Sequence, residues 1–187
     1  MRVTREQAEA NRQRIVEAAS ALFRKHGFDG VGVDDITKAA GLTHGGFYGH
    51  FRSKDDLAAE ACAHDGVDPW VAWMDAPPDK RLDGLVRSYL TTRHRDNRSN
   101  GCLFAALGSE VVRQPKAVRH AFTERFRSKV DALIHLLPGR SAAARREQGL
   151  ATMAGLVGAL TLSRAVDDPK LADEILEAAA NTFGGPC

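Results

Sequence analysis

The chain has 187 residues, 43% of them hydrophobic, which is enough for one large or two small domains with a buried core. Its net charge is only +2, so binding to nucleic acid would require clustered basic residues. Cys62, Cys102 and Cys187 show no Cys-x-x-Cys spacing, which argues against a disulfide framework and a structural zinc site. No signal peptide is expected, and the longest apolar run, residues 149–163, is too short and too rich in Gly, Thr and Ser for a membrane span. These features predict a soluble, cytoplasmic protein.

The N-terminal segment predicts a basic amphipathic helix. Thr4 and Gln7 form a capping box that can begin it, and apolar residues recur at helical spacing over residues 15–23. Gly27 is expected to end this helix. Up to Lys25 the segment carries six basic and three acidic residues, with the arginines mostly off the apolar face. The positive charge is therefore clustered, as nucleic-acid binding would require.

Residues 33–51 predict two short helices joined by a tight turn. Gly41 follows the first helix directly, at a position where a helix end favours positive φ and no Cβ. Thr43 can cap the second helix, with its hydroxyl accepting a backbone N–H. Phe47 and Phe51 are four residues apart, so they share the buried face of that helix. These are the parts of a helix-turn-helix, whose second helix enters the DNA major groove.

The stretch from Arg12 to Leu57 resembles the DNA-binding domain of the TetR/AcrR family of bacterial transcriptional regulators. It has the three-helix spacing of the family and an aromatic-His-Phe-x-Ser-Lys exit. The matching residues are Ile15, Ala19, Leu22-Phe23, Gly27-Phe28, Asp35-Ile36, Ala40-Gly41-Leu42-Thr43, Phe47-Tyr48, His50-Phe51, Ser53-Lys54 and Leu57. The rest of the chain carries a weaker resemblance.

The resemblance implies which residues contact DNA. In the family, the residues that match Tyr48 and Lys54 bind backbone phosphates, and Thr43 is placed to do the same. Alternatively, Tyr48 could cover the edge of the core. The candidates for reading bases are His44, Gly45 and Gly46 at the start of the recognition helix, and His50 nearer its end.

The recognition helix departs from the commonest family pattern because it contains Gly45, Gly46 and Gly49. Each glycine costs about 1 kcal/mol relative to Ala in a helix interior. We therefore expect packing of Phe47 and Phe51, or DNA itself, to hold the helix. Glycine offers no side chain for base readout, so specificity would rest on His44, on close approach of the backbone and on DNA shape.

The remaining chain predicts helices only, separated by Pro- and Gly-containing breaks, with no strand-like alternation. A fourth helix begins near Lys54 and runs to the break at residues 76–79, and polar residues 93–100 are expected to form a loop. Later helices are expected around residues 82–90, 102–112, 115–137, 141–164 and 169–183. The prediction is an all-α fold of about nine helices. Residues 1–55 would form a three-helix helix-turn-helix domain, and residues 56–187 a helical bundle for ligand binding and dimerisation.

Small residues in the helix expected at 141–164 indicate a close helix crossing. Ala151, Gly155 and Ala159 are four apart on one face, with Gly158 beside them. Ordinary packing within the chain would also explain this spacing. The family resemblance implies a homodimer formed through a four-helix bundle of the last two long helices, which would place two recognition helices on a pseudo-palindromic operator.

Large side chains of the second part are candidates for an effector cavity between helices, although a plain core is the simpler explanation for each. The candidates are Trp70, Trp73, Tyr89, Cys102, Phe104, Phe122, Phe126 and Met153. Cys102 follows Asn100-Gly101 at an expected helix start, where a thiol can become reactive, although buried free cysteines are usually inert.

No catalytic pattern is present in the sequence. His44-Gly45-Gly46 resembles an oxyanion-hole sequence, but there is no Gly-x-Ser-x-Gly elbow to accompany it. His-Glu-x-x-His, P-loop and Gly-x-Gly-x-x-Gly patterns are absent too, and the seven histidines lack metal spacing. We therefore expect no enzyme activity, metal or cofactor.

The predicted function is that of a homodimeric transcriptional regulator, a repressor that a small molecule releases from double-stranded operator DNA. The alternative is a helical ligand-binding protein or thiol-based electrophile sensor with weak or lost DNA binding.

Overall fold

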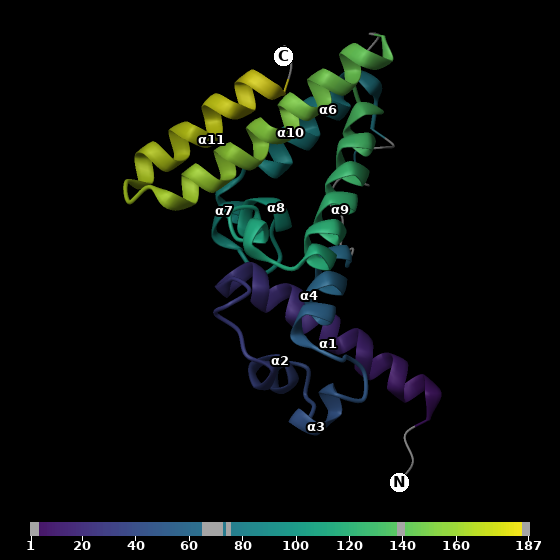
Figure 1. Ribbon diagram of the computed structural model, residues 1–187. Coiled ribbons are helices and arrows are strands. Elements are labelled where there is room, and N and C mark those ends of the chain that lie inside the picture. Colours follow the sequence, from purple (N-terminus) through teal and green to yellow (C-terminus); the bar gives the residue numbers. More distant parts are fainter. Residues whose placement is uncertain (1–3, 65–72, 74–75, 138–140, 185–187) are drawn as a thin grey trace. The chain divides into compact units, whose positions relative to one another are not determined.

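The computed structural model describes residues 4–64, 73, 76–137 and 141–184 (Figure 1). Within these ranges the chain forms ten α-helices with defined ends and one 3-10 helix, and it contains no strand. This confirms the all-α prediction. None of the helices in the described part is long and apolar enough to cross a membrane. The chain divides into two compact units, Met1–Gly66 with Arg98–Arg125, and Val67–Asn97 with Phe126–Cys187.

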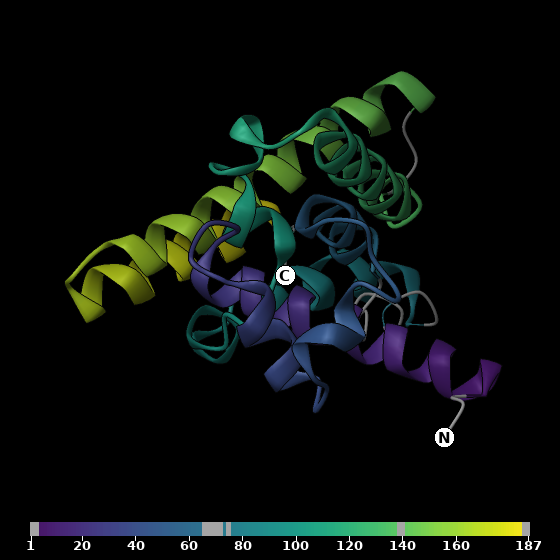
Figure 2. The ribbon, with the colours of Figure 1, turned by 60° about the horizontal axis from the view of Figure 1, so that its bottom comes forward.

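The first unit contains the N-terminal helices and a later segment of the chain. Its elements are α1 (Arg5–His26), α2 (Val33–Ala39), α3 (His44–Phe47), α4 (Lys54–Ala63), α8 (Leu103–Leu107), the 3-10 helix Val111–Arg113 and the first part of α9 (Lys116–Ile134). Figure 2 brings α2 and α3 toward the viewer, next to the purple α1. Both α2 and α4 pack on α1, and α2 packs on α3.

Helix α1 begins and ends where the sequence predicted. The Thr4 hydroxyl accepts a hydrogen bond from Gln7 N at 3.2 Å, and Thr4 N donates to Gln7 Oε1 at 3.0 Å, which completes the capping box. Gly27 ends the helix with φ of 80°. The Glu110 side chain lies next to this helix end, and its Oε2 accepts a hydrogen bond from Phe28 N at 3.0 Å. This bond ties the end of α1 to the segment between α8 and the 3-10 helix.

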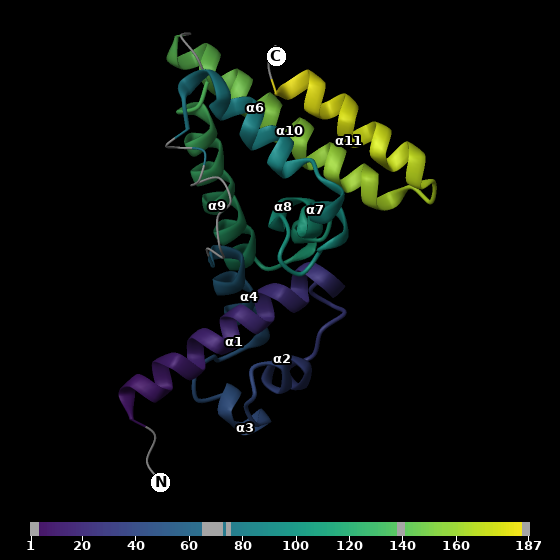
Figure 3. The same cartoon turned by 180° about the vertical axis from the view of Figure 1, so that it is seen from behind.

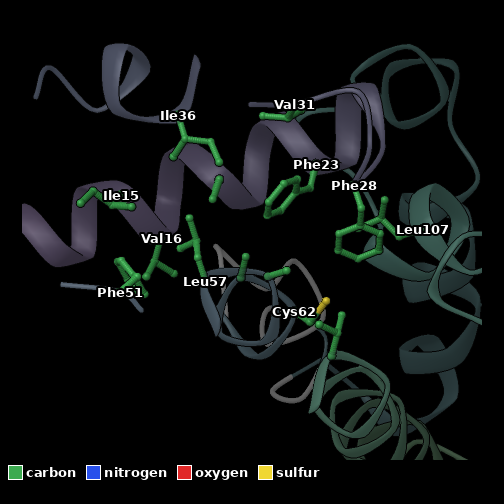
Figure 4. Packing of buried hydrophobic residues seen from close by; sticks show 14 of the residues in the cluster. Ile15, Val16, Phe23, Phe28, Val31, Ile36, Phe51, Leu57, Cys62 and Leu107 are labelled. Carbon is green, nitrogen blue, oxygen red and sulfur yellow. The ribbon is translucent and has the colours of Figure 1, made fainter. Parts of the chain in front are cut away.

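A continuous hydrophobic cluster holds the first unit together (Figure 4). Helix α1 contributes Ile15 and Phe23, with 0% and 1% of their surface exposed, and α4 contributes Leu57 at 0%. Leu107 and Val118, from the later segment, are also buried in this cluster. Full burial of one such side chain stabilises a fold by about 1.5–3 kcal/mol, so the segment 98–125 is part of the N-terminal core.

This grouping differs from a division at residue 55. Four residues of α4, namely Leu57, Ala58, Ala61 and Cys62, are buried in the same cluster as α1. A boundary placed before α4 would cut through this core. The predicted 1–55 and 56–187 domains therefore remain a functional proposal, distinct from the compact units.

The second unit contains α6 (Pro78–Tyr89), α7 (Thr92–Asp96), the later part of α9, α10 (Ala142–Ala165) and α11 (Pro169–Phe183). Helices α10 and α11 lie side by side, as Figures 1 and 3 both show. Ser141 caps α10 by accepting a bond from Ala144 N, and Asp168 caps α11 by accepting bonds from the amides of residues 170 and 171. Both helix starts agree with the prediction.

Three expectations about helix ends were wrong. Helix α4 ends at Ala63, because His64 is extended with ψ of 121°, rather than reaching residue 75. The expected loop at 93–100 contains the short α7, because Thr91 caps it by accepting a bond from His94 N at 3.1 Å. The expected helix at 102–112 is instead α8 followed by a separate 3-10 turn.

Candidate nucleic-acid interface

The turn between α2 and α3 is a Schellman motif. Gly41 has φ of 68°, its N–H donates to Lys38 O at 3.1 Å, and Leu42 N donates to Thr37 O at 2.8 Å. The predicted glycine position is thereby confirmed. This geometry ends α2 abruptly and sets the direction in which the next segment leaves.

The recognition segment, residues 44–51, is held by two buried phenylalanines. Phe47 has 0% and Phe51 4% of its surface exposed, and their ring centroids are 5.6 Å apart. Arg12 of α1 lies over the Phe51 ring at 4.8 Å from its centroid and pairs with Glu60 of α4. Packing on the core therefore fixes the inner side of this segment.

Regular helix in the recognition segment covers only His44–Phe47. Tyr48 is still in the αR region, and the amides of His50 and Phe51 both donate to Phe47 O at 2.9 and 3.0 Å, which forms a turn. The recognition helix is thus shorter than expected. Glycines at 45, 46 and 49 weaken the helix, which agrees with their unfavourable helix propensity.

The outer side of the recognition segment is exposed, with Tyr48 at 61%. The Tyr48 ring meets Phe47 edge-on at 5.2 Å between centroids and lies 5.5 Å from the His44 ring. Thr43 and Gly45 are exposed as well, whereas Gly46 and His50 are partly buried. The candidate DNA residues from 43 to 48 are therefore adjacent to one another, supported from below by Phe47.

Thr43 occupies the N-cap position of α3, but its side chain makes no capping hydrogen bond. Its backbone oxygen accepts the Gly46 N–H at 2.9 Å instead. The expectation that the Thr43 hydroxyl caps the helix was wrong, because the backbone carbonyl takes the N–H that the hydroxyl would have bound. Thr43 as a whole residue is exposed, as is the neighbouring His44.

His44 pairs with Asp34, which lies in the first turn of α2. Asp34 was not among the predicted site residues. Its position ten residues before His44 carries no local signal, since the pair depends on the angle that the Schellman turn imposes between α2 and α3. The two exposed fractions are 53% for the His44 side chain and 80% for that of Asp34.

Lys54 begins α4 behind Ser53, whose hydroxyl accepts a bond from Asp56 N at 3.1 Å. Its side chain is partly buried, with Nζ 6.0 Å from the centroid of the Phe23 ring. In this rotamer the ammonium group therefore lies near a buried aromatic ring of α1.

The three glycines of the recognition segment are not required by neighbouring atoms. A Cβ on Gly45 would meet nothing within 4 Å, and those on Gly46 and Gly49 would meet their nearest atoms at 3.8 and 3.6 Å. None of the three has positive φ. Neither space nor backbone conformation within the chain therefore explains why these positions lack side chains.

The predicted effector residues divide between the two units. Phe104 and Phe122 pack edge to face at 5.1 Å in the first unit, together with Cys102. In the second unit, Tyr89 and Met153 have 5% and 1% of their surface exposed. Phe126 also belongs to the second unit, and Trp70 lies outside the described residues. A single cavity formed by all of them stays a prediction.

Trp73 has a structural role in the second unit. Its Nε1 donates to Ser88 Oγ at 3.0 Å. Its ring lies against Gly84 of α6, where a Cβ would come within 2.2 Å of Cζ3.

A surface hollow of about 270 Å³ lies along α6 and α11, and none of the predicted effector residues lines it. The residues that line it are Arg87, Leu90, Thr92, Asp173, Leu176, Glu177 and Ala180.

The cysteines in the described part differ in accessibility. Cys62 is buried, and burial raises its pKa to about 12, so its thiol stays protonated and unreactive at neutral pH. Cys102 is partly exposed and occupies the N-cap position of α8. Arg24, whose Nε donates to Ser99 O at 2.7 Å, lies within electrostatic reach of both cysteines, and burial lowers its pKa.

The predicted dimer residues of α10 face in different directions. A Cβ on Gly155 would lie 2.1 Å from Phe183 Cζ of α11, so this glycine serves packing within the chain, and Ala159 is buried at 8%. Ala151 is exposed, and a Cβ on Gly158 would meet nothing within 4 Å. Only Ala151 and Gly158 therefore lie on a surface that a second protomer could use.

Comparisons with known proteins point to one family. Residues 15–61 match the sequence profile of bacterial regulatory proteins of the tetR family. The chain is 41% identical over 59 residues to the HTH-type transcriptional regulator AcrR of Shigella flexneri, covering 32% of this chain and 27% of AcrR. It is 39% identical over 88 residues to the probable acrEF/envCD operon repressor of Escherichia coli strain K12, covering 47% and 34%. Both matches span well under half of the relative's length.

The fold is similar to solved structures over almost the whole chain. A TetR-family transcriptional regulator from Cytophaga hutchinsonii superposes with a TM-score of 0.76 at 22% identity, covering 94% of this chain and 94% of that chain. At this identity the likeness concerns the fold. It agrees with the two-part helical architecture described above.

Proposed function

We propose that this chain, a member of the TetR family of bacterial regulatory proteins, is a DNA-binding transcriptional regulator of the repressor type. One observation carries the proposal. A Schellman turn and two buried phenylalanines hold a segment in which Thr43, His44 and Tyr48 are exposed and the His44 and Tyr48 rings lie 5.5 Å apart. A helix-turn-helix uses such a surface in the DNA major groove.

The contacts fall into two classes. Tyr48, Lys54 and the Thr43 hydroxyl would bind backbone phosphates, which positions the protein without reading sequence. Base edges would meet His44 and the backbone of Gly45 and Gly46, with His50 at the partly buried end. Because the glycines present no side chains, close approach to the bases and DNA shape would contribute to the choice of site.

The protein would act as a homodimer in the cytoplasm. Ala151 of α10 is exposed, Gly158 is partly buried with open space at its Cβ position, and Leu162 of α10 and Leu171 of α11 are 57% and 42% exposed. Apolar side chains exposed along two adjacent helices favour association with a second copy through a four-helix bundle. A two-fold dimer would bring two recognition segments to a pseudo-palindromic operator.

A small-molecule effector would release the repressor from its operator, as is typical of the family. Its proposed site is in the second unit, among Tyr89, Phe126 and Met153. A ligand shifts the equilibrium between DNA-binding and released states only through its different affinity for the two. Of the two cysteines within the described residues, Cys62 is buried and unreactive, so Cys102 is the candidate in a thiol-based variant of this mechanism.

Selection of genomic duplex fragments by the ligand-free protein tests the function. We expect a pseudo-palindromic site to be enriched. Lys54→Ala should weaken binding to all duplexes about equally and lower the slope of log affinity against log salt by about one unit, because one phosphate contact is lost. Lys80→Ala is the matched control, since Lys80 is an exposed lysine of α6 in the second unit. If no duplex is enriched, the alternative of a ligand-binding protein without DNA binding takes its place.

A further inference from the structure

The hydrogen-bonded pair of Asp34 and His44 lies on the proposed DNA-binding side of the first unit. It joins the first turn of α2 to the first residue of α3 through the Asp34 carboxylate and His44 Nδ1. Both side chains are more than half exposed. Exposed ion pairs typically contribute about 0–1 kcal/mol to stability, so the main consequence of this pair is the orientation of the imidazole.

The pair determines which His44 nitrogen carries a proton. A carboxylate can only accept hydrogen bonds, so Nδ1 must donate, whether the ring is neutral or charged. An unconstrained neutral imidazole prefers the opposite tautomer, with the proton on Nε2. With Nδ1 occupied by Asp34, the nitrogen left for another molecule is Nε2, at the far end of a half-exposed ring.

The ring of His44 also lies close to an aromatic ring of the recognition segment. The Tyr48 ring lies 5.5 Å from it between centroids, and Tyr48 itself rests edge-on against the buried Phe47. The residues that follow His44 are Gly45 and Gly46, which add no side chain. The recognition segment therefore has few side chains other than His44 that could hydrogen-bond to a base.

We propose that Asp34 is a positioning residue for DNA recognition, which fixes the tautomer and direction of His44 so that Nε2 meets a base edge in the major groove. The inference rests on the proposed function. Neutral His44 would present Nε2 as an acceptor toward the exocyclic amine of adenine or cytosine, and charged His44 would present a donor toward guanine. Asp34 thus contributes to sequence discrimination without touching the DNA.

Two other roles for Asp34 make different predictions. A plain acidic residue near DNA repels every duplex equally, so its removal would raise affinity without changing the order of preferred sequences. A residue that reads a base directly, as an aspartate can from cytosine N4, would act independently of His44. A positioning residue changes discrimination only while His44 is present.

The first measurement uses the free protein, so it does not depend on DNA binding. Nitrogen-15 shifts of the His44 ring, recorded where the ring is neutral, should show Nδ1 protonated and Nε2 bare in the wild type. Asp34→Ala should shift the ring toward the Nε2-protonated form. Asp55→Asn is the matched control, since Asp55 is an exposed aspartate in the first turn of α4, and it should leave the His44 shifts unchanged. A wild-type ring with the proton on Nε2 overturns the inference.

The second measurement compares affinities for the selected operator and a scrambled duplex at fixed salt. We expect Asp34→Ala and Asp34→Asn to lower this ratio about fivefold, the lower end of the discrimination from one base contact. Asp55→Asn should raise both affinities and keep the ratio. In a His44→Ala background, Asp34→Ala should have no further effect on the ratio.

The outcomes separate this inference from the proposed function. A wild type that selects an operator whose ratio is unaffected by Asp34→Ala overturns the inference and leaves the function standing. The same holds if the effect of Asp34→Ala persists in the His44→Ala background, because Asp34 would then read the base itself. A wild type that selects no duplex overturns the proposed function, and the inference with it.

Discussion

Glycines occur in both α10 and the recognition segment, but their surroundings differ. In α10, a Cβ on Gly149 would lie 2.8 Å from Ile134 Cγ1, and one on Gly155 would lie 2.1 Å from Phe183 Cζ. In the recognition segment, Cβ atoms on Gly45, Gly46 and Gly49 would meet no atom closer than 3.6 Å. Gly149 and Gly155 are explained by the chain's own packing, whereas the three glycines of the recognition segment are not.

The difference indicates where to look for a partner. A glycine that no intrachain contact requires still lowers helix stability, by up to about 1 kcal/mol relative to Ala. Keeping three of them in one short exposed segment is consistent with a molecule that approaches its backbone closely. Gly158 of α10 resembles the glycines of the recognition segment, because a Cβ there would meet no atom within 4 Å.

The largest effect is expected from Phe47→Ala, because packing rather than helix propensity holds the recognition segment. Phe47 has no exposed surface, and truncation of such a residue typically costs about 3–5 kcal/mol. Urea unfolding of the variant should show that the free energy of unfolding has fallen by this amount. Tyr48→Ala is the control, since its ring is 61% exposed, and its unfolding should change by less than about 1 kcal/mol. Equal losses would mean that packing on Phe47 does not anchor the segment.

A pair of substitutions in α10 tests the contrast between required and open glycines. Gly155→Leu should destabilise the fold by about 1–3 kcal/mol, because the new side chain overlaps Phe183 within the chain. Gly158→Leu should leave the unfolding of the protomer nearly unchanged but weaken dimerisation, measured by sedimentation at micromolar concentration. A monomeric wild type, or a Gly158→Leu variant that dimerises normally, contradicts the proposed interface.

Gly45→Ala sharpens the comparison on the DNA side. The methyl group has free space within the chain, and alanine favours a helix over glycine by up to about 1 kcal/mol. We expect slightly greater thermal stability together with weaker binding to the selected operator, because the methyl would separate the backbone from the bases. Unchanged operator affinity would show that the backbone does not approach DNA closely at this position.

The smallest effect concerns Cys102, the partly exposed thiol at the start of α8. Under the thiol-sensor alternative, a small electrophile should release wild-type protein from its operator and leave Cys102→Ser bound. Cys62 should contribute nothing, since its pKa of about 12 keeps the thiol protonated. Release of both proteins to the same extent would exclude Cys102 as the sensor and direct attention to a non-covalent effector.

Local signals in the sequence were enough for the turn and for most helix starts. Gly41, with its positive φ, and the caps at Thr4, Ser53 and Ser141 act through neighbours three to five residues away. The three-helix pattern of the helix-turn-helix region extends this local information to a family match at residues 15–61.

Features that depend on distant contacts could not be predicted in this way. The role of Gly155 depends on Phe183, and the orientation of His44 depends on Asp34 across the turn. The assignment of segment 98–125 to the N-terminal core depends on Leu107 and Val118, which give no sign in the sequence of the helices that they pack against.

Hydroxyl-radical footprinting of the ligand-free protein on its selected duplex tests the central claim most directly. A dimer with one recognition segment per protomer should protect two short stretches on one face of the DNA, with centres one helical turn, or a multiple of about 10 base pairs, apart. Tyr48→Ala should weaken both stretches together, because phosphate contacts at the two half-sites are equivalent by symmetry. A single protected stretch, bound by one protomer, would contradict the account. So would the absence of any protection at a protein concentration that saturates binding to the duplex.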